Sequence, residues 1–201
     1  MRLLNIETGQ MMILGKHDNG VCRVCYDPHS KLLFSGSWDA TVKVWDPYGE
    51  PADALKATLT MPGKVFAMDV SPPSATLPAQ LVVAMSDRAV HVYNTSKLQV
   101  ALNGPNADSC EPEQRRESSL KFMLRDVKST PDGTGYVTSS VEGRVAVEFL
   151  DTSEAAQAQK YAFKCHRKEV DGVDVVYPIH AVAFHPVYGT FATCGGDAHC
   201  A

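Results

Sequence analysis

Residues 36–46 read Gly-Ser-Trp-Asp-Ala-Thr-Val-Lys-Val-Trp-Asp, and this stretch decides the fold. Its Trp-Asp-Ala portion predicts a tight turn, because aspartate favours turns by hydrogen-bonding to nearby backbone. Residues 41–45 then alternate as a strand does, with Val42 and Val44 on one face. Pro47 ends the run, since proline cannot donate a hydrogen bond within a sheet. The sequence therefore predicts a turn followed by a half-buried strand.

The same pattern recurs in weaker form along the chain. Turn residues at equivalent positions are spaced 48, 55 and 55 residues apart, and they are Asp39, Asp87, Glu142 and Asp197. An apolar segment that predicts an inner strand precedes each turn, and these segments are residues 21–26, 65–70, 124–128 and 179–184. Strand repeats of about 40 to 45 residues are typical of propeller blades. We therefore expect a repeat array.

Residues 36–46, with a histidine ahead of them, resemble a WD40 repeat. The resemblance implies an all-β fold, an incomplete WD40 β-propeller of about three whole blades plus partial blades at both ends. It also implies a buried polar network, whose members would be His17, Ser35 or Ser37, Asp39 and Trp45. Such a network is stable only if every member is paired. We therefore interpret these residues as structural and not catalytic.

The repeat spacing predicts where each unit begins and ends. The expected units are residues 1–13 as the tail of a preceding blade, 14–60, 61–106 and 107–167 as blades, and 168–201 as the start of a truncated blade. Residues 46–59 and 99–113 are expected to hold outer strands with long loops. Propellers usually close with about four to eight blades, which protects their sheet edges. We therefore interpret the chain as a fragment of a ring.

Composition narrows the class of protein. The chain has 201 residues, of which 44% are hydrophobic and 21% charged, as in ordinary globular proteins. Its formal net charge of −4 argues against direct nucleic-acid binding, which normally needs a basic surface. No apolar run is long enough for a membrane span or a signal peptide, so no membrane partner is expected. We therefore expect the protein to lie in a reducing compartment, either the cytosol or the nucleus.

The six cysteines are expected to be free thiols, as is usual in reducing compartments. Cys22 and Cys25 have the spacing of half a zinc site. Positions three apart on a strand point to opposite faces, so we expect no shared metal ion there. Cys194, His199 and Cys200 form another small group, in a segment that we expect to be a frayed tail.

No catalytic signature occurs in the sequence. It has no G-x-S-x-G nucleophile motif, no phosphate-binding P-loop and no H-E-x-x-H zinc motif. Gly143, Gly195 and Gly196 fall in expected turns, where glycine supplies a positive φ without any phosphate. The sequence therefore predicts a protein that is not an enzyme, with no catalytic residues, no cofactor and no metal.

The second half of the chain carries more specific strings. Residues 114–121 read Gln-Arg-Arg-Glu-Ser-Ser-Leu-Lys, residues 143–151 read Gly-Arg-Val-Ala-Val-Glu-Phe-Leu-Asp, and residues 161–167 read Tyr-Ala-Phe-Lys-Cys-His-Arg. These strings resemble the Bub family of spindle-assembly-checkpoint WD40 proteins, and the resemblance covers residues 3–197. The WD40 mRNA-export factors share parts of the last two strings. We rank the checkpoint family first.

The resemblance implies a non-enzymatic scaffold. Its partners would be a glutamate-containing peptide motif of checkpoint kinases and phosphorylated kinetochore repeats, or alternatively a nucleoporin. The expected location is the nucleus, with the kinetochore in mitosis, although the cytoplasm also fits. A truncated product with no independent function is the remaining alternative.

Arginine suits such ligands, because its planar fork pairs two carboxylate or phosphate oxygens. The candidate peptide-binding residues are Arg144, Lys164, Arg167, Arg125 and Trp38. Each cation has a plain alternative as a solvated charge or as the partner of Glu142, Glu148 or Asp126. For Trp38, packing between blades is the alternative.

Overall fold

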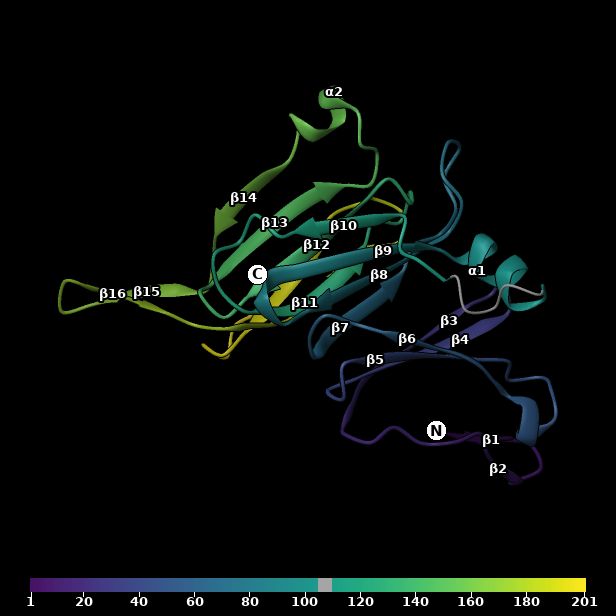
Figure 1. The fold of residues 1–201 in the computed structure, drawn as a ribbon. Coiled ribbons are helices and arrows are strands. Elements are labelled where there is room, and N and C mark those ends of the chain that lie inside the picture. Colours follow the sequence, from purple (N-terminus) through teal and green to yellow (C-terminus); the bar gives the residue numbers. More distant parts are fainter. Residues whose placement is uncertain (105–109) are drawn as a thin grey trace.

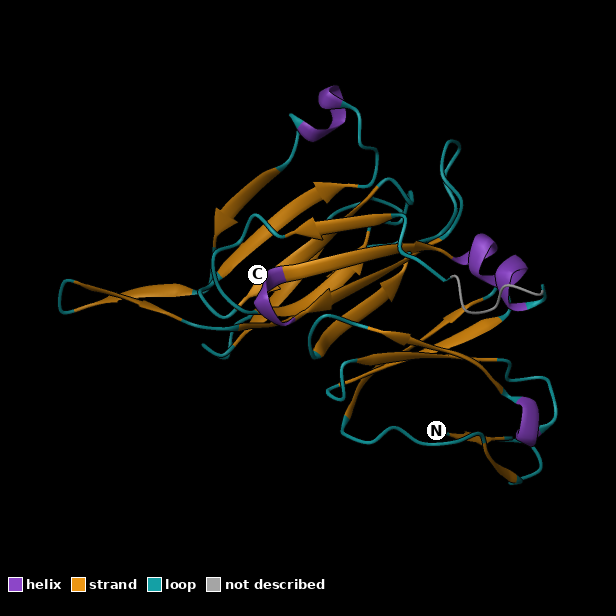
Figure 2. Ribbon diagram, viewed as in Figure 1, coloured by secondary structure: helices purple, strands orange, loops and turns teal. Residues whose placement is uncertain are grey.

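A computed structural model describes residues 1–104 and 110–201, which form antiparallel sheets with few helices (Figures 1 and 2). Three sheets have four strands each. The first contains β3 (Val21–Asp27), β4 (Leu32–Ser37), β5 (Thr41–Trp45) and β6 (Leu55–Thr60). The second contains β7 (Val65–Val70), β8 (Gln80–Met85), β9 (Ala89–Asn94) and β10 (Gln114–Glu117). The third contains β11 (Leu124–Ser129), β12 (Gly135–Ser140), β13 (Arg144–Phe149) and β14 (Tyr161–Lys164).

Shorter elements surround these sheets. Three strand pairs are β1 (Arg2–Leu4) with β2 (Met11–Ile13), β15 (Arg167–Val170) with β16 (Val173–Val176), and β17 (Ile179–Phe184) with β18 (Phe191–Gly195). The helices are η1 (Pro51–Asp53), η2 (Ser86–Arg88), α1 (Thr95–Leu102) and α2 (Glu154–Gln157). The β15–β16 hairpin projects away from the sheets in Figure 1. Among the described residues, no helix has the length and apolar character needed to span a bilayer.

The sheets pack face to face through the side chains that alternate along each strand. Phe34 and Val44 of the first sheet share a core with Met68 and Leu81 of the second. A second core joins the second and third sheets, and a third joins the third sheet to β17. The first strands of successive sheets also contact one another, in the order β3, β7, β11 and β17. This all-β repeat arrangement is consistent with a β-propeller.

The four predicted turns are confirmed, and they share one geometry. In each, a backbone N–H at the end of the second strand donates to a carbonyl just before or at the start of the first strand. The pairs are Trp38 to Gly20, Ser86 to Lys64, Val141 to Met123 and Gly196 to Pro178, at 2.8–3.1 Å. The residue that follows each turn position has a positive φ; these residues are Ala40, Arg88, Gly143 and Ala198, and in the second turn Asp87 has one as well. Four structural repeats therefore follow the spacing seen in the sequence.

The described residues of the range 99–113, which are 99–104 and 110–113, do not form the expected outer strand. The chain forms α1 from Thr95, because the Asn94 side chain accepts a hydrogen bond from the Lys97 N–H at 3.1 Å and so caps the helix. The fourth strand of the second sheet is β10, which pairs with β9. The expected boundary between residues 106 and 107 lies outside the described residues. It separates two strands of one sheet, and so the units 61–106 and 107–167 do not match the second and third sheets.

The two cysteines of β3 point to the same face, so the expectation of opposite faces is wrong. The pairing of β3 with β4 shifts between Val21 and Arg23, where a bulge changes the alternation. Cys22 Sγ donates to the Val65 carbonyl at 3.1 Å, and Cys25 Sγ to the Met68 carbonyl at 3.3 Å. Burial raises the pKa of Cys22 to about 11 and that of Cys25 to about 12. Both are therefore protonated thiols at neutral pH.

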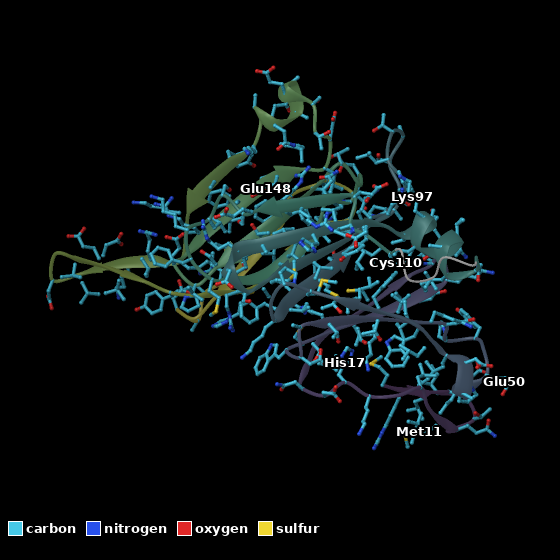
Figure 3. The ribbon with its side chains drawn as sticks, viewed as in Figure 1. Met11, His17, Glu50, Lys97, Cys110 and Glu148 are labelled. Carbon is cyan, nitrogen blue, oxygen red and sulfur yellow. A yellow bond between two sulfur atoms is a disulfide. The ribbon has the colours of Figure 1, made fainter. Side chains whose placement is uncertain are left out.

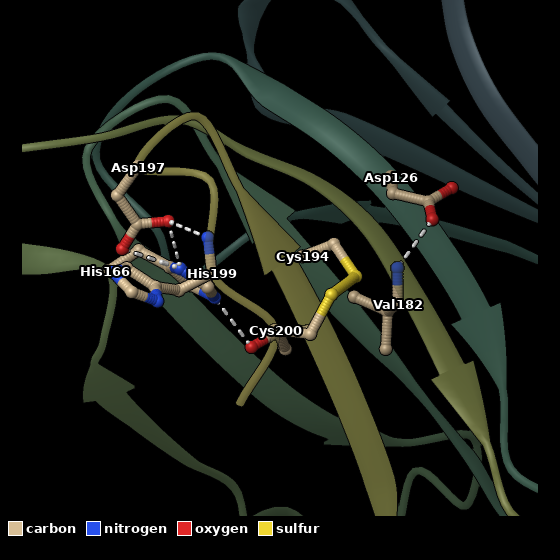
Figure 4. Close-up of a disulfide and its surroundings, with 8 residues drawn as sticks. Asp126, His166, Val182, Cys194, Asp197, His199 and Cys200 are labelled. Atoms are coloured by element: carbon tan, nitrogen blue, oxygen red, sulfur yellow. Dashed lines mark hydrogen bonds and ion pairs between the residues drawn. A yellow bond between two sulfur atoms is a disulfide. The ribbon is translucent and has the colours of Figure 1, made fainter.

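The expectation of free thiols is wrong for Cys194 and Cys200, which form a disulfide (Figure 4). The tail is also not frayed. The turn at Asp197 reverses the chain, and Thr193 and Ala201 exchange backbone hydrogen bonds at 2.7 and 2.9 Å. Residues 199–201 thus lie antiparallel to β18, which brings the two sulfur atoms together.

Candidate functional site

A buried polar network links the turn of the first sheet to its strands. His17 Nδ1 lies 2.9 Å from Asp39 Oδ2, and His17 Nε2 lies 2.7 Å from Ser35 Oγ. The Trp45 indole N–H donates to the same Ser35 oxygen at 2.8 Å. Ser37, the alternative serine, instead accepts from the Asp39 N–H at 3.2 Å. The structure therefore joins four of the candidate residues through Ser35, and Figure 3 places His17 beside this sheet.

The Asp39 carboxylate is held in its charged form. Burial would raise its pKa, but hydrogen bonds from Thr41, the Asp18 N–H and His17 outweigh that effect. The net result is a pKa well below the usual value for aspartate. Asp39 is thus an ionised anchor for the turn, which is a structural role.

We expect the advantage of the wild-type chain over Asp39→Asn to shrink as pH falls below about 4. The folded-state pKa is depressed, so the charged carboxylate stabilises the fold above its unfolded pKa and loses this effect as acid protonates it. Urea unfolding of both variants at pH 7, 5 and 3 measures the difference. A constant difference across this range would contradict the assignment.

A second network of the same kind lies near the end of the chain, and sequence reasoning missed it. His166 Nδ1 lies 2.9 Å from Asp197 Oδ1, and His166 Nε2 lies 2.8 Å from Thr193 Oγ1 (Figure 4). The histidine precedes its aspartate by 31 residues here, against 22 residues for His17 and Asp39. The β15–β16 hairpin lies between them and lengthens the spacing, which hid the signal.

Three candidate cations gather at the turn of the third sheet. Arg144 begins β13 directly after this turn, and Lys164 lies opposite it in β14. Arg167 begins β15, and its Nη2 donates to the Glu142 carbonyl at 3.1 Å. Arg167 is thus a strand residue. The three cations therefore lie together at the turn end of the third sheet.

Two of these cations each lie beside a carboxylate. Arg144 Nε lies 3.5 Å from Glu142 Oε2. Arg167 Nη1 donates to Asp174 Oδ2 at 2.6 Å. Lys164 is exposed and makes no ion pair within residues 1–104 and 110–201. The Glu142 pairing was one of the plain alternatives for Arg144, and the Asp174 pairing was not foreseen.

The two remaining candidates lie apart from this cluster. Arg125 lies on β11, where its Nη2 is 3.1 Å from His180 Nδ1 of β17. Trp38 lies in the turn of the first sheet, with 50% of its surface exposed. Phe122 and Met123, which are also exposed, immediately precede β11. The equivalent turn geometry puts all these residues at the same end of their sheets, so they share the turn face of the molecule.

Three cationic side chains at one turn suit the recognition of an anion. The described residues contain no group of three or more histidine, cysteine, aspartate or glutamate side chains able to hold a metal ion. The cations instead present several N–H donors from rigid strand ends, which is the arrangement that carboxylates and phosphates require.

Comparison with known proteins agrees with this architecture. The WD domain, G-beta repeat family matches residues 9–46, which include the His17 network. The chain is 47% identical over 199 residues to the mitotic checkpoint protein BUB3.1 of Arabidopsis thaliana, which covers 98% of this chain and 54% of the relative. The chain carries a WD repeat and resembles mitotic checkpoint proteins along almost its whole length.

The export factors are similar as well, at lower identity. In Caenorhabditis elegans, the mitotic checkpoint protein bub-3 is 42% identical to this chain, over 98% of the chain and 53% of the relative. The mRNA export factor rae-1 of the same organism is 33% identical, over 98% of the chain and 50% of the relative. The chain thus spans about half the length of the curated relatives it matches.

Proposed function

We propose that this chain is a non-enzymatic WD-repeat scaffold of the mitotic checkpoint, and that its four-stranded sheets are propeller blades. The identities of 47% and 42% to the checkpoint proteins of Arabidopsis thaliana and Caenorhabditis elegans, against 33% to mRNA export factor rae-1, support this ranking. The proposed location is therefore the nucleus, and the kinetochore during mitosis. The proposed partners are a checkpoint kinase and a phosphorylated kinetochore scaffold.

The proposed ligand is an extended peptide that carries adjacent glutamates or a phosphothreonine. The observation that carries this proposal is the convergence of Arg144, Lys164 and Arg167 at one turn. Lys164 makes no ion pair in the described part of the chain, and the guanidinium groups of Arg144 and Arg167, each beside one carboxylate, carry further N–H donors for an anion. Trp38 would add an apolar contact, and Arg125 a further charge. An extended peptide fits, because these residues are spread along the turn face.

Arg144→Ala and Arg167→Ala should each weaken peptide binding by about 5- to 30-fold, as expected when a binding arginine is removed. Fluorescence anisotropy with a labelled phosphothreonine peptide and a double-glutamate peptide measures this. Lys160→Ala is the matched control, because Lys160 is exposed and lies just before β14, at the opposite end of that strand from Lys164. Equal affinity in all three variants would exclude this site.

A nucleoporin-binding export factor is the second candidate, because the similarity to mRNA export factor rae-1 extends over 98% of the chain. The same assay distinguishes the two. Nucleoporin-derived and checkpoint-kinase-derived peptides compete for the labelled probe, and the checkpoint peptide should displace it at lower concentration. Preference for the nucleoporin peptide would reverse the ranking, and aggregation without any binding would favour a product with no independent function.

A further inference from the structure

We propose that Asp174, on the projecting β15–β16 hairpin, forms an ion pair with Arg167 in the free protein, and that the incoming anion must displace the Asp174 carboxylate. The carboxylate would thereby lower the affinity of the site for anions that contact Arg167. This inference rests on the proposed function, because it concerns the same peptide-binding residues. The new element is a carboxylate of the chain itself that competes with the ligand for Arg167.

The contacts of Arg167 divide into a fixed part and an exchangeable part. Nη2 donates to the Glu142 backbone carbonyl at 3.1 Å, and Nε is buried without a partner in the described structure. Nη2 is therefore held by the turn of the third sheet. Nη1 instead donates to Asp174 Oδ2 at 2.6 Å. Replacing Asp174 thus leaves Arg167 anchored at Nη2 while it frees Nη1.

Asp174 itself is easily displaced. Its side chain is 55% exposed, against 20% for Arg167. Its hairpin projects away from the sheets (Figure 1). Val170, Val173 and Val176 of the hairpin are also exposed, so little packing holds it in place. An exposed ion pair contributes little to stability, and a ligand therefore loses at most about fivefold in affinity by breaking it.

The turn of the third sheet, which contacts Arg167, has a different acidic residue from the other turns. Asp39 and Asp197 occupy the same turn position in two other repeats, and each pairs with a histidine. Glu142 instead reaches Arg144. Glu142 is only 16% exposed and its carbonyl holds Arg167, so it belongs to the fixed part of the site. The exchangeable carboxylate is therefore Asp174.

Competition of this kind weakens binding of every anion that contacts Arg167 Nη1, because each must break the same ion pair with Asp174. A phosphothreonine carries a charge of about −1.5 to −2 at neutral pH, whereas one glutamate carries −1. Asp174 repels both groups. Removing the Asp174 charge should therefore strengthen binding of glutamate peptides and of phosphorylated peptides.

The test compares Asp174→Asn with Glu169→Gln by fluorescence anisotropy. Glu169 lies directly opposite Asp174 in the hairpin, is exposed, and makes no ion pair in the described part of the chain. Both substitutions remove one negative charge from the same hairpin with little change in shape. We expect Asp174→Asn to bind the double-glutamate peptide about two- to fivefold more tightly than wild type, and Glu169→Gln to change binding by less than about 1.5-fold.

A double variant completes the test. The gain from Asp174→Asn should disappear when Arg167 is also replaced by alanine, because the proposed competition acts only on Arg167. Weaker binding of Asp174→Asn would mean that Asp174 positions Arg167 for its ligand, and an equal gain in Glu169→Gln would mean a general charge effect. Either result overturns the inference.

The two proposals fail in different ways. Weaker binding in Arg167→Ala with no gain in Asp174→Asn would leave the proposed function intact and remove only this inference. An unaffected Arg167→Ala with weaker binding in Arg144→Ala would likewise remove only this inference. No binding by wild type or by Asp174→Asn, or binding unaffected by both Arg144→Ala and Arg167→Ala, would overturn both proposals.

Discussion

Trp45→Ala is expected to lower the free energy of unfolding by about 3–5 kcal/mol, the usual cost of truncating a buried aromatic side chain. Trp45 is fully buried and packs against Leu14 and Ala54. Its indole N–H also donates to Ser35 Oγ, which contacts His17. The substitution therefore opens a cavity and removes one member of a paired network. Chemical denaturation monitored by circular dichroism measures the loss.

Trp45→Phe separates the two contributions. Phenylalanine keeps most of the apolar volume but cannot donate to Ser35, so we expect a loss of about 1–2 kcal/mol. A loss as large as that of the alanine variant would show that the hydrogen bond dominates. Losses below about 1 kcal/mol in both variants would contradict the packing of this residue in the core.

Asp126→Ala is expected to cost about 2–4 kcal/mol of the free energy of unfolding. The Asp126 side chain is 2% exposed, and it pairs with Arg23 of β3 while it accepts from the Val182 N–H of β17 at 2.9 Å (Figure 4). This one carboxylate joins the first and third sheets to β17. Its removal leaves a buried N–H unpaired and a partly exposed arginine without its partner, which places the cost below that of a fully buried pair.

Asp126→Asn retains an acceptor for Val182 but loses the charge, so its cost should be clearly smaller. Urea unfolding of both variants at neutral pH makes the comparison. Equal losses would mean that the ion pair with Arg23 carries the whole effect. Neutral behaviour of both variants would show that Asp126 does not hold the sheets together.

Local patterns in the sequence were sufficient for the turns, and the resemblance to a WD40 repeat was sufficient for the first polar network. Asp39 and Trp45 lie in one contiguous motif, and their interactions depend on short-range turn and strand geometry. The strand alternation likewise predicted the buried face of Val42 and Val44, both of which are fully buried. Such features need only the neighbouring residues to be known.

Features that depend on one extra residue or on an inserted segment were missed. The bulge in β3 reversed the expected facing of Cys22 relative to Cys25. The cap at Asn94 diverted the chain into α1 and moved the outer strand to β10. The inserted hairpin changed the spacing of His166 and Asp197. In each case a small local change shifts every later position relative to a fixed pattern.

The candidate binding residues show the same division. Composition and motif resemblance singled out Arg144 and Arg167, but their sequence positions do not reveal which carboxylates lie near them. Asp174 meets Arg167 only because β15 and β16 pair in one register, and Asp126 meets Val182 only because β11 packs beside β17.

The sequence by itself determined the repeat and its turns, because these follow from hydrogen bonds and side-chain alternation over a few residues, whereas the network around His17 was implied by the resemblance to a WD40 repeat. Only the tertiary structure decided which charges are paired and which remain available to a ligand. Electrostatic pairing depends on distance in space, and strand register and sheet packing bring together residues such as Arg23 and Asp126 that are far apart along the chain.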